Sequence, residues 1–182
     1  MNQLNEEQTM MVDAARKLVR ETIIEPRVDM ALDKSGEFPH EVYRVIWESG
    51  LANLEFPEEV GGAGLSCYDH CLITQEIQYG CLGIGTSVTA NNLAAMPVII
   101  AGNEAQKKKY LGMLTEEPLY AAYACSEPDA GSDVAAMSTR FEKKGDKYIL
   151  NGVKRWITNA DVASWYLVFA REDGTKGHKG VA

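Results

Sequence analysis

Tyr123-Ala-Cys-Ser-Glu-Pro-Asp-Ala-Gly-Ser-Asp133 is the stretch around which the rest of this sequence is organised. The apolar run 119–125 predicts a buried strand, and Pro128 stops it because proline has no N–H for the ladder. A loop of small and acidic residues follows over 129–133. Its backbone N–H groups are expected to approach a ligand closely and to bind an anion, with the hydroxyls of Ser126 and Ser132 as further donors.

A second segment, Arg155-Trp-Ile-Thr-Asn159, follows about two dozen residues later. The β-branched and aromatic content of 153–158 predicts a strand, in which Trp156 and Thr158 share one face. That face offers an aromatic plane for stacking and a hydroxyl for hydrogen bonding. Local chemistry alone also allows an ordinary turn and a core tryptophan.

Composition sets the broad class. The 182 residues suffice for one large domain or two small ones, and 46% hydrophobic with 24% charged residues is typical of a globular protein. A net charge of -8 argues against nucleic acid as a partner. No apolar run approaches the ~20 residues that cross a bilayer, so no membrane contact is expected. The polar start indicates no signal peptide, and we expect a cytoplasmic protein or a processed chain of the mitochondrial matrix.

Helical signals dominate the first two thirds. Three N-cap signals mark helix starts: Asn5 with Gln8, Ser66 with Asp69, and Asn103 with Gln106. The small-residue apolar run 82–101 predicts a helix buried on most sides, and Pro97 is expected to kink or divide it.

The pattern changes after Pro118. Gly145-Asp146 and Asn151-Gly152 are two-residue hairpin signals that flank a short strand over 147–150. Further strands are expected at 153–158 and 164–171. The sequence therefore predicts an α+β protein, with a helical domain over 1–117 and a β-domain over 118–182.

The cysteines indicate neither a disulfide framework nor a zinc motif. Cys67, His70 and Cys71 could face one another on a helix. Two further well-placed ligands would be needed, so no metal site is predicted.

Taken together, the Ser126–Asp133 loop and the Trp156–Asn159 segment resemble the signature of the acyl-CoA dehydrogenase family. The stretches 57–64 and 100–104 are also similar to the family. The resemblance covers nearly the whole chain, is strongest to the medium-chain members, and represents only the amino-terminal portion of a family protein. It implies a helical bundle domain followed by a truncated small β-barrel or sheet domain, with the carboxy-terminal helical bundle missing.

The resemblance implies FAD-dependent α,β-desaturation of fatty acyl-CoA thioesters, with hydride passing to the flavin. The cofactor-binding residues that it implies are Tyr123, Cys125, Ser126, Gly131, Ser132, Trp156, Ile157 and Thr158. Acyl-CoA is expected to contact Ser132, Gly85 and Thr89, and the small side chains at 85 and 89 suggest a deep pocket for medium-to-long acyl groups.

The catalytic base of the family lies in the second helical bundle, which puts it beyond residue 182. No catalytic residue is therefore predicted here, and Glu127 is expected to fix the loop. The implied partners are an electron-transfer flavoprotein and further copies of the chain in a homotetramer. An acyl-CoA oxidase-like flavoprotein and a non-catalytic truncated module of the same fold remain alternatives.

Overall fold

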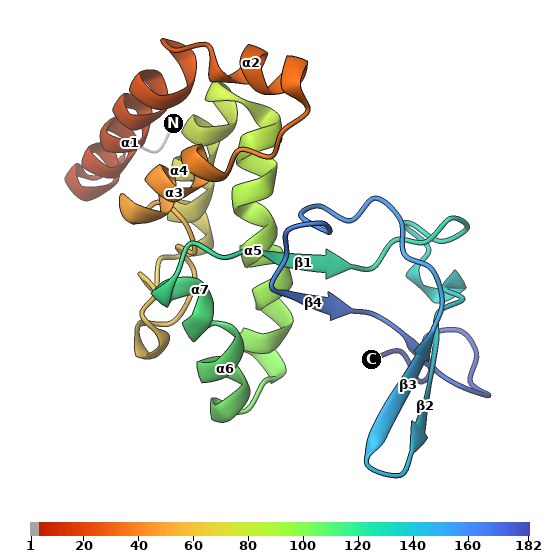
Figure 1. Cartoon of the computed structure of the whole chain (residues 1–182). Coiled ribbons are helices and arrows are strands. Elements are labelled where there is room, and N and C mark those ends of the chain that lie inside the picture. The colour runs from red at the N-terminus through yellow and green to blue at the C-terminus, as the bar shows by residue number, and fades with distance from the viewer. Residues whose placement is uncertain (1–3) are drawn as a thin grey trace.

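The computed structural model describes residues 4–182, in which helices come first and strands follow (Figure 1). The helices are α1 (Glu6–Val19), the π-helix η1 (Arg20–Ile24), α2 (Val28–Ser35), α3 (His40–Glu48), η2 (Glu58–Val60), α4 (Cys67–Gly80), α5 (Leu82–Ala101), α6 (Glu104–Tyr110), α7 (Gly112–Glu116) and η3 (Val134–Ala136). The strands are β1 (Ala121–Ala124), β2 (Arg140–Lys144), β3 (Lys147–Asn151), β4 (Trp165–Val168) and β5 (Arg171–Glu172). This order confirms the predicted α+β class.

Side-chain caps begin three helices where the sequence predicts them. Asn5 Oδ1 accepts from the Gln8 backbone N–H at 2.7 Å, and Gln8 Oε1 accepts from the Asn5 N–H at 3.1 Å. Asn103 and Gln106 form the same capping box, and the Ser66 side chain caps α4. These side chains satisfy N–H groups that the first helical turn leaves free.

Helix α2 was not predicted, because no side chain caps its start. Residues with left-handed backbone conformation flank the helix instead: Arg27, at φ 55°, precedes it, and Gly36, at φ 69°, follows it. A turn set by backbone angles alone leaves little trace in the residue types.

Helix α5 is the central element of the helical part. It runs unbroken through Pro97, so of the two expected effects, a kink or a division, the division is wrong. Burial of Ala94 and Ala95 just before the proline holds that turn in place. Among the described residues, α5 is also the one helix long and apolar enough to span a membrane, contrary to the expectation from sequence. Half of its apolar window is buried inside the protein, as in the core helix of a globular domain.

Two apolar clusters surround α5. One packs its first half against α1, α3 and α4, and the other packs its second half against the α6–α7 region and β1. Asn91 is fully buried on this helix, where its Nδ2 donates to the Tyr43 hydroxyl at 2.8 Å. Its Oδ1 accepts from the Ala121 N–H at 2.7 Å, which fixes the start of β1 on α5.

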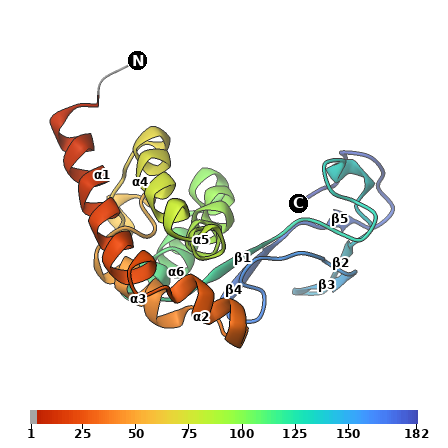
Figure 2. The ribbon, with the colours of Figure 1, turned by 90° about the horizontal axis from the view of Figure 1, so that it is seen from above.

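The strands form two small sheets. β1 and β4 pair in parallel, with Ala121 opposite Trp165. β2 pairs with β3 in an antiparallel hairpin and with β5 in parallel. Seen from above, β1 and β4 lead away from the helices toward this second sheet (Figure 2). The predicted turn at Gly145-Asp146 is confirmed, with Gly145 at φ 64°.

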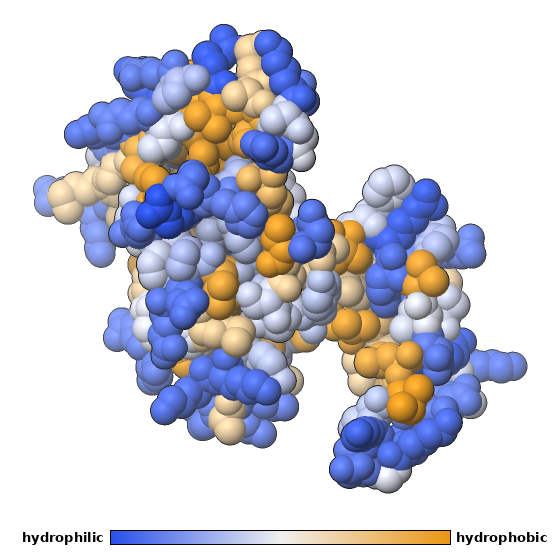
Figure 3. All heavy atoms as spheres, in the orientation of Figure 1, coloured by the Kyte–Doolittle hydropathy of each residue, from blue (hydrophilic) through white to orange (hydrophobic). Residues whose placement is uncertain are grey.

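Every residue of β3 is exposed, and Figure 3 shows apolar side chains gathered on the hairpin. Tyr148 and Leu150 are 60% and 52% exposed. The hairpin therefore presents an apolar edge, and an uncovered edge strand is a surface that natural domains normally protect.

The predicted strand over 153–158 is wrong, and so is the hairpin turn at Asn151-Gly152. The chain after β3 forms bends and turns, with Trp156 at φ 61° and Asn159 at φ 64°. Left-handed residues interrupt the alternation of faces that a strand needs. Trp156 and Thr158 therefore do not share a strand face, and the protein positions them by tertiary contacts instead.

Candidate functional site

The loop after β1 is organised around the carboxylate of Glu127, which is 5% exposed. Its Oε2 accepts from the Ser138 N–H at 2.5 Å and from the Ser138 hydroxyl at 2.6 Å. Its Oε1 accepts from the Thr139 N–H at 3.0 Å. Backbone hydrogen bonds in both directions between Glu127 and Ala130 then close the loop. The carboxylate thus ties this loop to the start of β2.

Lys154 connects this loop to the second signature segment. Its Nζ donates to Glu127 Oε1 at 2.8 Å and to the Cys125 carbonyl at 3.0 Å. The Arg155 N–H donates to the Ser126 carbonyl at 2.9 Å, which adds a backbone link. Two segments that are far apart in sequence are therefore fastened side by side.

The same contacts control the ionisation of Glu127. Burial alone raises the pKa of a carboxyl, but the hydrogen bonds from Lys154, Ser138 and Thr139 together outweigh burial. They hold the pKa of Glu127 well below its usual range. A carboxylate with so low a pKa is a poor base, which supports the expectation that this residue fixes the loop.

Trp156 stands out in the second segment because a bulky side chain rarely adopts a positive φ. Its indole is 80% exposed, and the Arg155 guanidinium carbon lies 4.7 Å from its ring centre. A strained, exposed aromatic residue is typical of a ligand site. The segment is anchored just beyond by Asn159, whose Nδ2 donates to the Ser87 carbonyl at 2.9 Å and whose Oδ1 accepts from the Ser87 hydroxyl at 2.5 Å.

A cleft of about 610 Å³ opens between this anchored segment and the faces of α4 and α5. The residues that line it are Glu55, Cys67, His70, Cys71, Thr86, Thr89, Ala90, Asn92, Leu93, Met96, Tyr123, Ser126, Trp156, Ile157 and Thr158. Most of the residues implied for the cofactor thus share one cleft with Thr89, which was implied for the substrate. Burial is the main reason that the pKa of Tyr123 is raised, so its phenol stays neutral in this wall.

The other implied residues lie elsewhere. Cys125 is half-buried beneath the loop, and Gly131 and Ser132 are exposed at its tip. The N–H groups of Gly131 and Ser132 donate to no backbone carbonyl within residues 4–182, as an anion-binding loop requires. Gly85 does not line the cleft, since a Cβ there would meet Gln78 Cγ at 2.4 Å. Close packing of α4 on α5 therefore accounts for glycine at 85.

Sequence reasoning missed Glu55 and Asn92 on this side of the cleft, and it considered His70 only as a metal ligand. His70 Nδ1 lies 2.6 Å from Glu55 Oε2, which also accepts from Asn92 Nδ2 at 3.2 Å. The consecutive asparagines 91 and 92, within a largely apolar helix, were the available signal. The charge of Glu55, with a smaller contribution from Cys71, raises the pKa of the Cys67 thiol. Within residues 4–182, no group of three His, Cys, Asp or Glu side chains could hold a metal ion.

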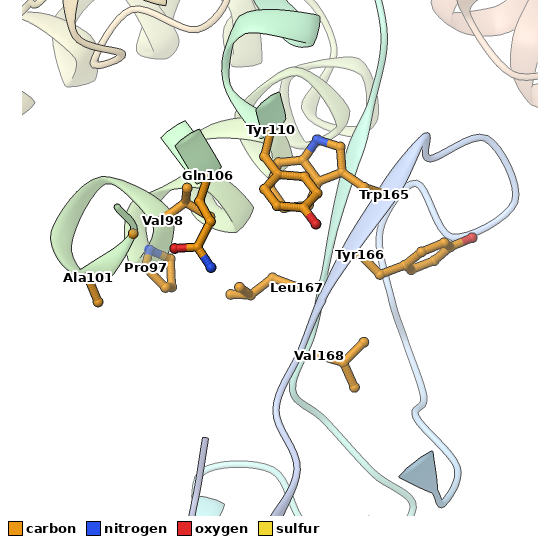
Figure 4. Close-up of a pocket in the computed structure, with 10 residues that line it drawn as sticks. Pro97, Val98, Ala101, Gln106, Tyr110, Trp165, Tyr166, Leu167 and Val168 are labelled. Carbon is orange, nitrogen blue, oxygen red and sulfur yellow. The ribbon is translucent and has the colours of Figure 1, made fainter. Parts of the chain in front are cut away.

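A second hollow, of about 380 Å³, lies between α5, α6 and β4 (Figure 4). Leu167 points into it beside Gln106, while Tyr166 points away from it. Its lining is apolar or neutral and contains none of the residues implied for cofactor or substrate. The larger cleft is therefore the candidate functional site.

A helical part is followed by a small sheet part, and residues of both line the cleft. The family model of the acyl-CoA dehydrogenase N-terminal domain matches residues 5–117, and that of the middle domain matches residues 122–182. The chain belongs to the acyl-CoA dehydrogenase family.

Individual relatives agree with this assignment. The chain is 45% identical over 170 residues to a probable mitochondrial medium-chain specific acyl-CoA dehydrogenase 2 of Caenorhabditis briggsae, covering 93% of this chain and 41% of that protein. A chain from the structure of the electron transferring flavoprotein of Acidaminococcus fermentans is 37% identical with a TM-score of 0.90, covering 100% of this chain and 48% of the other. A glutaryl-CoA dehydrogenase of Mycobacterium smegmatis in complex with FADH2 is 28% identical with a TM-score of 0.85, and the match covers 93% of this chain and 44% of that one. The chain thus spans less than half the length of these relatives.

FAD is the cofactor of this family, and the residues present fit it. The cleft offers the exposed indole of Trp156 and the hydroxyls of Ser126 and Thr158. At Gly131 an added Cβ would meet no atom within 4 Å, so the backbone there is open to a phosphate. Within residues 4–182, packing does not require glycine at this position.

Proposed function

We propose that this chain supplies the flavin-binding and acyl-binding walls of an FAD-dependent acyl-CoA dehydrogenase that desaturates fatty acyl-CoA thioesters between Cα and Cβ. One observation carries the proposal. Ser126 and the Trp156-Ile-Thr158 segment line the same cleft as the α5 residues Thr89 and Leu93. A planar cofactor and an acyl chain would therefore lie against each other in one cleft.

Desaturation needs a base for the α-proton and an acceptor for the β-hydride, and bound FAD supplies the acceptor. The residues of this chain bind and orient. Trp156 offers a stacking plane, and the hydroxyls of Ser126 and Thr158 can donate hydrogen bonds where negative charge develops on reduction. The free N–H groups of Gly131 and Ser132 suit the pyrophosphate.

We propose no catalytic base within this chain. Glu127 is the buried acidic residue of the cofactor loop, but four donor contacts occupy its two oxygens. Glu55 lies in the cleft but is engaged by His70 and Asn92. The base in this proposal comes from another part of the active enzyme.

Substrate and partners follow from the same proposal. Thr89 lines the cleft on α5, and its short side chain leaves room for a medium-to-long acyl chain. Gly85 no longer supports that inference, because it packs against α4. An electron-transfer flavoprotein as acceptor, a homotetrameric assembly, and a cytoplasmic or mitochondrial-matrix location complete the proposal.

The test is the visible absorption spectrum of the chain after incubation with FAD and desalting. Retained flavin absorbance is the expected result. Trp156→Leu should lower retention, because it removes the stacking plane. Tyr148→Leu is the matched control, since it removes an exposed aromatic residue on β3 that does not line the cleft, and should retain FAD as the unaltered chain does. Equal retention by both variants would contradict the proposed cofactor wall.

The electron acceptor is tested separately with the reduced, FAD-loaded protein. Slow reoxidation in air and rapid reoxidation by an electron-transfer flavoprotein are expected of a dehydrogenase. Rapid reoxidation by oxygen would identify the oxidase-like alternative. Failure of the chain to retain any FAD would favour the non-catalytic alternative.

A further inference from the structure

The cleft contains a polar cluster that the cofactor contacts do not use. Glu55 follows the buried turn at Leu54, His70 comes from α4, and Asn92 comes from α5. The side chains of Glu55 and His70 are only 12% and 14% exposed. Three polar groups from separate segments thus meet in one wall of the cleft.

The hydrogen bonds within this Glu55–His70–Asn92 cluster leave binding capacity free. Glu55 Oε2 lies 2.6 Å from His70 Nδ1, so the carboxylate fixes the proton of the ring on Nδ1. The other ring nitrogen, Nε2, has Asn92 Nδ2 at 3.4 Å, which is too long for a strong hydrogen bond. Nε2 is therefore available to a ligand.

Stability does not explain the cluster. Asn92 is 5% exposed, and its Oδ1 has no hydrogen-bond partner within residues 4–182. Burying a polar group without a full set of partners costs free energy, which apolar residues in an apolar helix would avoid. A buried, partly satisfied polar group in a ligand cleft indicates a functional role.

The cluster interrupts an apolar wall. Thr89, Leu93 and Met96 recur at the four- and three-residue spacing that places side chains on one face of α5, and all three line the cleft. Asn92 lies on that face beside Leu93, with Glu55 and His70 against it. An acyl chain that follows this wall therefore meets polar groups partway along it.

We propose that Glu55, His70 and Asn92 form a polar subsite that favours acyl groups carrying a hydroxyl over plain alkyl acyl groups. This inference rests on the proposed function. A hydroxyl can donate a hydrogen bond to His70 Nε2, which accepts because the ring proton is held on Nδ1 by Glu55. An alkyl chain leaves Nε2 without a partner, and the Glu55 carboxylate disfavours an acyl group that ends in a second carboxylate.

The test compares acyl-CoA thioesters of equal length, one plain and the others bearing a single hydroxyl at successive distal carbons. Each is titrated into the FAD-loaded full chain, and binding is followed by the change in flavin absorbance and by calorimetry. One hydroxylated thioester is expected to bind about tenfold more tightly than the plain one, the effect of one hydrogen bond of ~1.4 kcal/mol. His70→Phe, which keeps a ring and removes its nitrogens, should abolish this preference.

Two further variants keep the outcome interpretable. His70→Gln retains a polar terminus and should recover part of the preference, which separates loss of a hydrogen bond from misfolding. Leu93→Ala, in the same wall, should weaken the binding of the plain and the hydroxylated thioesters by the same factor. Equal binding of all thioesters, or a preference that survives in His70→Phe, would overturn the subsite and leave the dehydrogenase proposal standing. Binding of no thioester would overturn both.

Discussion

Replacing Glu127 by glutamine tests whether one buried carboxylate holds the two signature segments together. The carboxylate accepts from Ser138, Thr139 and Lys154, and it is 5% exposed. Glutamine is nearly the same size but has one acceptor oxygen, and its amide would face groups that are themselves donors. Glu127→Gln would also leave the charge of Lys154 without its partner in a site where that side chain is 12% exposed.

Removing one member of a buried ion pair costs about 3–5 kcal/mol of unfolding free energy. Lys154 keeps its hydrogen bond to the Cys125 carbonyl at 3.0 Å, so we expect a loss near the lower end, about 3 kcal/mol. Because Lys154 directly precedes the Arg155 N–H that pairs with Ser126, the variant should also lose FAD on desalting.

The pH dependence of stability gives a second readout. Contacts with Lys154, Ser138 and Thr139 lower the pKa of Glu127 in the folded state from its ordinary value of 4.5, against the opposing effect of burial. The resulting stabilisation is complete above pH 4.5 and is lost as the pH falls below it toward the folded-state pKa. Glu127→Gln should therefore be less stable near neutral pH, and its stability should fall less steeply in acid.

Urea unfolding of the chain, followed by circular dichroism at several pH values, measures both effects. Glu142→Gln is the matched control, since that carboxylate on β2 pairs with Lys144 at 2.7 Å but is 41% exposed, and it should change stability by less than about 0.5 kcal/mol. A loss for Glu127→Gln below about 1 kcal/mol, or no greater than that of the control, would refute the reasoning.

Three further predictions concern the cofactor loop, the anchor of the Trp156 segment and the alkaline limit of stability. Gly131→Val should change the free energy of unfolding by less than about 0.5 kcal/mol, because a Cβ there meets no atom within 4 Å. The same variant should weaken FAD binding at least tenfold. The control Gly83→Ala should leave FAD binding unchanged. Unfolding caused by Gly131→Val would show instead that the loop itself requires the glycine. Asn159→Ala should lower the free energy of unfolding by about 2–4 kcal/mol, because it removes the hydrogen-bond partners of buried Ser87 and places alanine at a positive φ. A loss under about 1 kcal/mol would contradict the anchoring role. Burial, with a smaller effect of the Glu41 charge, raises the pKa of Tyr120 to about 12. The stability of the chain should therefore fall as the pH rises from ~10 toward that value, and it should fall less in Tyr120→Phe. Identical alkaline unfolding curves for the two proteins would exclude the ionisation of Tyr120 as the cause of alkaline unfolding.

Much of this structure was readable from local sequence because the interactions are local. A capping box needs only Asn5 and Gln8, three residues apart, and a hairpin turn needs only a glycine that tolerates a positive φ, as at 145. The loop of residues 126–133 was likewise predictable as the end of the strand from its small residues and proline. Its roles in binding remain predictions that the experiments above test.

The conformation of the Trp156 segment was decided by tertiary structure. Its residue types favour a strand, but Asn159 is drawn into the buried space between Ser87 on α5 and the start of β1, and the chain turns to follow it. The free energy of satisfying these buried polar groups exceeds the preference of valine, tryptophan and isoleucine for extended backbone.

The sequence alone therefore determined the order of helices and strands and the residues of the cofactor loop, because neighbours along the chain set both. Only the tertiary structure decided that Ser126 and Thr158 line one cleft and that Glu55 and His70 lie opposite them. These groups come from segments more than a hundred residues apart at the extremes, and they meet because α4 packs on α5 and because Glu127 and Asn91 bind the strands to that helical base. Contacts of this kind depend on the summed packing of the whole chain, which no short stretch of sequence encodes.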